Sequence, residues 1–180
     1  MNAKFSARTI TVTAALSAVA VVLGATQWGF IPVPTPAGHA TIMHVPVILG
    51  AILEGPMVGA IIGAVFGLYS FLDATLPIFK DPLVAILPRL FIGPMAYYAY
   101  MLTRRWGESV ASGMAAVVGT VTNTVLVLGM IVIRGYLDAR TAWAVGVTHG
   151  LPEIIVAALI VIPVVLMWKR VEFGRGRSRL

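Results

Sequence analysis

Six apolar segments, separated by short breaks rich in proline, glycine or charge, take up most of this 180-residue chain. An α-helix needs roughly 20 apolar residues to cross about 30 Å of hydrocarbon, so a chain of this length has room for about six crossings and little else. We therefore expect an all-α membrane protein, with residues 1–180 forming a single domain, a bundle of six transmembrane helices. The expected helices span about 9–30, 40–53, 56–73, 83–102, 109–133 and 141–168.

The composition agrees with a protein that lies in a bilayer. Hydrophobic residues make up 59% of the chain and charged residues 11%, a balance that a water-soluble domain could not carry on its surface. The chain has no cysteine and only three scattered histidines, so we expect neither disulfides nor a metal site, and no cofactor. Motifs for phosphate, dinucleotide, zinc-protease or nucleophile-elbow chemistry are absent from the sequence, which argues against an enzyme and against an ATPase site.

The second apolar segment is short. About 14 residues rise only about 21 Å as a helix, so this segment could be re-entrant and partly buried instead of spanning.

The distribution of basic residues predicts the orientation of the bundle. With six crossings and both termini in the cytoplasm, nine of the thirteen Lys and Arg residues lie on the inner side, as the positive-inside rule requires. These nine are Lys4, Arg8, Arg104, Arg105, Lys169, Arg170, Arg175, Arg177 and Arg179. The net charge of +6 thus reflects topology, including a basic cytoplasmic tail at 169–180, and not nucleic-acid binding. We expect a multi-pass membrane protein with this orientation.

Small residues repeat at four-residue intervals in two of the segments. Gly55, Gly59, Gly63 and Gly67 lie along one face of the third helix, and Ala14 and Ala18 lie on one face of the first. Such faces allow close helix packing, either within one subunit or against another chain.

Polar side chains inside the apolar segments gather toward the expected outer side. A charged group in hydrocarbon costs roughly 2.5 to 3.5 kcal/mol, so each one needs a partner or a function. By position along their helices, the groups in the outer half are His44, Arg89, Asn123, His149, Glu153, Tyr69 and Asp73. We predict that they form a substrate-binding region.

Arg89 has two interpretations. In the first, it pairs with Glu153 or Asp73 and holds helices together. In the second, its planar guanidinium binds a substrate carboxylate through two hydrogen bonds. For the histidines and Asn123, helix-to-helix hydrogen bonds are as plausible as ligand contacts. Trp28 and Tyr97 are candidate pocket residues, although interfacial aromatic belts commonly use such side chains.

Two stretches of the sequence resemble the substrate-binding S components of energy-coupling factor (ECF) transporters. The first is His44-Val45-Pro46-Val47-Ile48-Leu49-Gly50, followed by Glu54-Gly55-Pro56 and the glycine series; the second runs from Asp81-Pro82 through Leu87-Pro88-Arg89 to Gly93-Pro94. The resemblance covers residues about 40 to 100 closely and fits the whole chain in length and helix count.

The resemblance implies a six-helix subunit that captures a vitamin from outside with high affinity. It also implies association with a transmembrane coupling (T) subunit and two ATPase subunits. The small-residue faces would contact the coupling subunit, and Ala14 and Ala18 fit the alanine motif that family members carry on the first helix. The pattern looks most like the branch that includes pantothenate and cobalamin transporters; pantothenate is the first choice, and folate or another micronutrient stays open.

Two other classes of function remain as alternatives. A self-standing channel or facilitator would conduct without any ATPase. An intramembrane enzyme would use His149 and Glu153 as an acid–base pair, but the sequence offers no nucleophile or metal to complete such a site.

Overall fold

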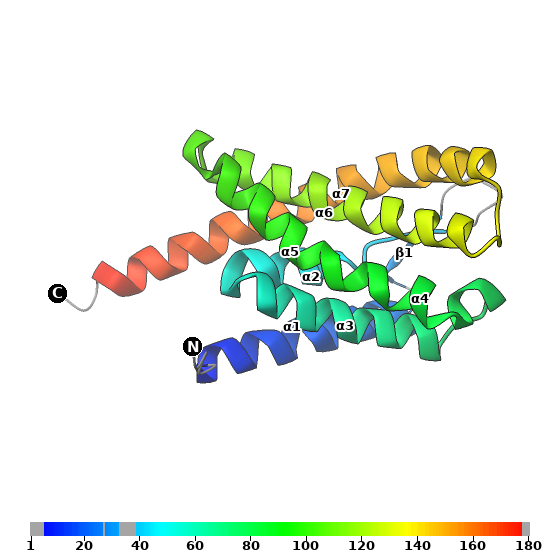
Figure 1. Ribbon diagram of the computed structural model, residues 1–180. Helices are drawn as coiled ribbons and strands as arrows, with labels where there is room; N and C mark the ends of the chain where they lie inside the picture. Colours follow the sequence, from blue (N-terminus) through cyan, green and yellow to red (C-terminus); the bar gives the residue numbers. More distant parts are fainter. Residues whose placement is uncertain (1–5, 27, 33–38, 178–180) are drawn as a thin grey trace.

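The computed structural model describes residues 6–26, 28–32 and 39–177, and within them the chain folds into a bundle of α-helices with one small hairpin (Figure 1). The predicted helical class is confirmed, and the long apolar helices are consistent with a membrane protein. Four helical stretches are long and apolar enough to cross a membrane: Ala7–Ala25, Pro82–Trp106, Glu108–Ile133 and Ala139–Val171. Two shorter apolar helices, Val45–Glu54 and Pro56–Leu72, complete the set.

The first predicted helix is too long at its C-terminal end. Helix α1 (Ala7–Ala25) stops at Thr26, and the chain then enters a two-stranded antiparallel hairpin formed by β1 (Phe30–Pro32) and β2 (His39–Thr41). The predicted ranges 9–30 and 40–53 had assigned the ends of this hairpin to helices. The proline-rich part of the connection, 33–38, lies outside the described residues.

Helix α2 (Val45–Glu54) is the short second segment and lies in the core. The side chains from Val45 to Ile52 are all buried, so this helix is covered by its neighbours and not by lipid. It rises about 15 Å, half of what a full crossing needs. Gly55, with φ of 103°, then turns the chain directly into α3 (Pro56–Leu72); this positive φ is a conformation that favours glycine.

The fourth predicted helix is broken near its beginning. After the 3₁₀ turn η1 (Pro77–Lys80), α4 (Pro82–Ala85) forms a single turn, and α5 (Leu87–Thr103) follows after Ile86. Prolines cause the break, because Pro82 and Pro88 lie in the first turns of the two helices, where a missing N–H costs no hydrogen bond.

The last two helices form the longest part of the bundle. After the 3₁₀ turn η2 (Arg104–Trp106), α6 (Glu108–Ile133) runs beside α5, and α7 (Ala139–Arg177) returns along α6. The helix extends to Arg177 and takes in most of the segment 169–180 that had been predicted as a tail. Helix α1 begins and α7 ends at the same end of the bundle (Figure 1, left).

The glycine face of α3 packs inside the subunit. A Cβ added to Gly59 would lie 2.8 Å from the Cα of Gly93 in α5 and 2.6 Å from the Cβ of Ala51 in α2. A Cβ added to Gly67 would lie 2.8 Å from the Cα of Ile86. The small residues therefore bring the α3 and α5 backbones into direct contact, and the intrasubunit interpretation of this face is confirmed.

Gly59→Val is expected to lower the free energy of unfolding by roughly 1–3 kcal/mol, because the added side chain overpacks the α3–α5 contact. Thermal unfolding in detergent would measure the change. Gly129→Val is the matched control, since a Cβ at Gly129 meets nothing within 4 Å. Equal melting temperatures for the two variants would contradict the contact.

Candidate functional site

Arg89 lies at the beginning of α5, where the break after α4 turns its side chain into the bundle. It is 5% exposed, and its Nη1 donates a hydrogen bond to the carbonyl of Val84 in α4. The guanidinium carbon lies 5.4 Å from the ring centre of Phe66 in α3 and 5.5 Å from that of Phe79 in η1. One carbonyl and two aromatic rings thus fix the position of the buried cation.

No carboxylate forms an ion pair with Arg89 among the described residues, where a pair is an N···O distance of 4.0 Å or less. Its Nε is buried and has no hydrogen-bond partner in this part of the chain. Glu153 lies beyond that distance, and its oxygens accept hydrogen bonds from Thr41 and Thr124. Asp73 instead accepts from Tyr69. The predicted alternative of a structural ion pair with Glu153 or Asp73 is therefore not formed.

His44 connects α2 to α6. It precedes the first turn of α2, is fully buried, and its Nε2 lies 2.9 Å from Oγ1 of Thr120. Asn123 lies about one turn further along α6, is 6% exposed, and its Oδ1 is a buried acceptor with no partner among the described residues. Both residues thus occupy the core near the hairpin end of the bundle.

Glu153 connects α7 to the hairpin. It is 5% exposed, its Oε1 accepts a 2.7 Å hydrogen bond from the backbone N–H of Thr41 in β2, and its Oε2 accepts from Oγ1 of Thr124 in α6 at 3.5 Å. The carboxylate therefore holds the end of the hairpin against the two longest helices, in the same region as His44 and Asn123.

The remaining predicted site residues are His149, Tyr69, Asp73, Trp28 and Tyr97. His149 is buried, and its Nδ1 lies 3.2 Å from the Val145 carbonyl within its own helix. Tyr69 donates a 2.8 Å hydrogen bond to Asp73 and packs against the core cluster. Trp28 is 82% exposed and Tyr97 stacks edge-on against Tyr98. Neither is among the residues that we call the buried polar group, which are His44, Arg89, Asn123 and Glu153.

Sequence analysis missed a second polar cluster beside Arg89. Arg134, at the end of α6, donates through Nε to Oδ2 of Asp81 at 2.6 Å, and the Tyr136 hydroxyl lies 3.4 Å from the same oxygen. Oδ1 of Asp81 caps α4 by accepting from the N–H of Leu83. The hydrogen bond from Arg134 holds the pKa of Asp81 below its ordinary value, so this carboxylate is charged at neutral pH.

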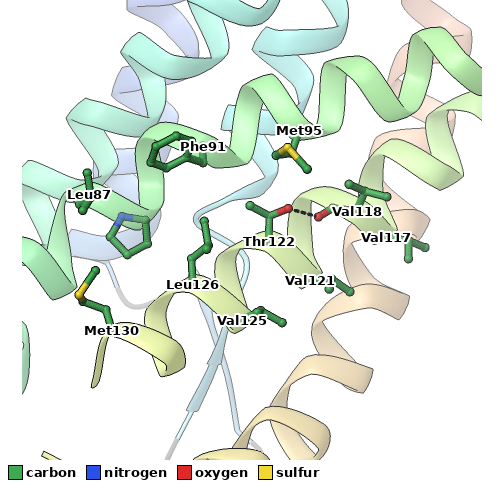
Figure 2. Close-up of a pocket in the computed structure, with 11 residues that line it drawn as sticks. Leu87, Phe91, Met95, Val117, Val118, Val121, Thr122, Val125, Leu126 and Met130 are labelled. Carbon is green, nitrogen blue, oxygen red and sulfur yellow. Dashed lines mark hydrogen bonds between the residues drawn. The ribbon is translucent and has the colours of Figure 1, made fainter. Parts of the chain in front are cut away.

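A hollow of about 640 Å³ lies elsewhere, between α5 and α6 on the surface of the bundle (Figure 2). Its walls are apolar, and the hydroxyl of Thr122 is already bound to the carbonyl of Val118. Phe91 and Met95 point into it from the face of α5 opposite Arg89. Exposed apolar walls of this kind suit contact with lipid tails.

The buried polar group can recognise a small anion with hydrogen-bonding groups. Arg89 offers a buried cation with an unused N–H, Asn123 an unused acceptor, and Glu153 a carboxylate. A guanidinium binds a carboxylate or phosphate through paired hydrogen bonds, whereas the amide and carboxylate suit hydroxyl or N–H donors. The group contains no cysteine, and no cluster of three metal-binding side chains occurs in the described ranges.

Two likenesses to known proteins identify the family of the chain. The chain is 30% identical, over an alignment of 152 positions covering 69% of this chain and 75% of the relative, to the protein named pantothenic acid transporter PanT of Lactococcus lactis subsp. cremoris (strain MG1363). A family model described as "ECF transporter, substrate-specific component" matches residues 8–165, which is most of the chain. The resemblance inferred from the sequence is thereby confirmed, and the chain belongs to the family of ECF transporter substrate-specific components.

Proposed function

We propose that this protein captures pantothenate from outside the cell and delivers it to an ATPase-driven coupling module. The observation that carries the proposal is Arg89, a buried cation that lacks an acidic partner within the described residues and keeps an unused N–H. A buried charge without a counter-ion is costly, so the site is best explained by a ligand that brings the negative charge.

Pantothenate matches the other groups of the site as well. It carries one carboxylate, one amide and two hydroxyls on a short flexible chain. The carboxylate would bind Arg89, and the amide and hydroxyl groups would bind Asn123, Glu153 and His44. The relative named as a pantothenic acid transporter supports this choice.

The proposal includes a topology and partners. Residues 1–180 form one transmembrane domain with six passes, α2 being a short buried one, and both termini lie in the cytoplasm of a prokaryotic cell membrane. Arg8, Arg104, Arg105, Lys169 and Arg170 then lie at the cytoplasmic end, as the positive-inside rule favours. The partners are a transmembrane coupling subunit, which would dock on Ala14 and Ala18, and two ATPase subunits that supply the energy.

Native mass spectrometry of the detergent-purified protein, followed by calorimetric titration, tests the choice of vitamin. We expect pantothenate to copurify or to bind with submicromolar Kd, while folate, cobalamin and pyridoxine do not. Tight binding of another of these vitamins would overturn pantothenate but keep the capture role. Binding of none of them would overturn the proposed function.

Liposomes separate this function from that of a channel or facilitator. Vesicles that contain the protein alone are expected to bind pantothenate without accumulating it in the lumen. Steady pantothenate flux without any ATPase would contradict dependence on a coupling module.

A further inference from the structure

The short connection between α3 and α5 supplies two of the three groups that surround Arg89. Phe79 of η1 lies against the guanidinium, and the carbonyl of Val84 in α4 accepts its hydrogen bond. The third group, Phe66, belongs to the long helix α3. The orientation of the Arg89 side chain therefore depends on where this connection, residues 77–85, is held.

An ion pair and a small apolar cluster hold the connection against α6. Asp81, between η1 and α4, pairs with Arg134 at the end of α6 with Nε and Oδ2 2.6 Å apart. In the apolar cluster, Val84 packs with Val127 and Ile131 of α6, and Phe79 packs against these residues. Asp81 is 8% exposed, whereas the Arg134 side chain is 47% exposed and is the part that reaches the surface.

We propose that the Asp81–Arg134 pair positions Arg89 for the ligand carboxylate by holding residues 77–85 in place. The inference rests on the proposed function, because it concerns the same binding site. Asp81 and Arg134 are positioning residues that do not touch the ligand: Asp81 uses both oxygens on Leu83, Arg134 and Tyr136. Recognition of a carboxylate through two parallel hydrogen bonds depends on the orientation of the guanidinium. Loss of the residues that hold Arg89 in position should therefore weaken this contact more than the other contacts of the site.

Two variants break the pair from opposite sides. Asp81→Asn keeps an oxygen to cap α4 and removes the charge, and Arg134→Gln removes the cation at a half-exposed position, where loss of the fold is not expected. Lys80→Gln is the matched control, because it removes a positive charge from the same connection at an exposed residue with no ion pair in the described part of the chain.

The measurement is the ratio of two dissociation constants, for pantothenate and for its neutral analogue in which a primary alcohol replaces the carboxylate. The wild type is expected to prefer pantothenate, and both variants to reduce this preference at least threefold. The control should leave the preference unchanged. Asp81→Asn in an Arg89→Ala background should cause no further loss, because both changes act on one contact. A purely structural role would weaken both ligands equally.

Unchanged preference in Arg134→Gln, additive losses in the double variant, or an equal loss in Lys80→Gln would each overturn the inference while leaving pantothenate capture intact. A wild-type protein that binds neither ligand would overturn the proposed function, and the inference with it. The two failures are thus distinguished by the wild-type titration alone.

Discussion

Arg89→Ala is expected to weaken pantothenate binding by tenfold or more. A hydrogen bond to a charged group contributes about 1.5–3 kcal/mol, and each 1.4 kcal/mol corresponds to a factor of ten in Kd. The structure supports this expectation, because Arg89 is buried beside two aromatic rings and forms no ion pair with a described residue. Calorimetric titration of the purified protein measures the effect.

Arg105→Ala is the control for this experiment. Arg105 is an exposed arginine at the opposite end of the bundle, where it lies over the ring of Trp106. Its loss should leave Kd unchanged. Arg89→Lys should recover only part of the affinity, since lysine keeps the charge but not the planar pair of donors. Wild-type affinity in a folded Arg89→Ala protein would assign the residue to structure instead of ligand binding.

Ala14→Trp and Ala18→Trp are expected to abolish vitamin uptake by the full transporter while leaving pantothenate affinity within about twofold of the wild type. Both alanines are exposed on α1, and only 11% of the apolar stretch of this helix is buried. A small face that the subunit itself leaves uncovered suits close approach of another helix, which an indole would prevent. Uptake in cells that express the complete transporter, together with titration of the isolated subunit, measures both quantities.

Leu159→Trp provides the comparison, because Leu159 is 68% exposed on α7, a different helix. This variant should transport normally. If the α1 variants also lose pantothenate binding, the cause is a misfolded bundle. If they transport like the wild type, the coupling subunit docks on another face.

Hydropathy was sufficient to predict the helices but not their ends. Apolar length located every long helix, because only helices satisfy backbone hydrogen bonds in lipid at that length. The hairpin was missed since Phe30 and Ala40 continue apolar runs, and a short apolar run does not distinguish strand from helix. Pro82 and Pro88 divide one apolar segment into two helices at Ile86, and a hydropathy profile does not show this division.

The candidate site was predicted in part, for a related reason. Arg89, His44 and Glu153 were identifiable because charged or hydrogen-bonding groups are rare and costly in apolar segments. Their partners were not, because Thr120 resembles many helical threonines and the donor to Glu153 is a backbone N–H, which any residue but proline carries. Asp81 and Arg134 lie 53 positions apart, and nothing in either local sequence indicates the other.

The backbone contact between Gly59 and Gly93 has a consequence for motion. At this point no side chain lies between α3 and α5, so sliding one helix past the other would drive flanking side chains into the opposite backbone. These two helices should move as one rigid frame that carries Arg89.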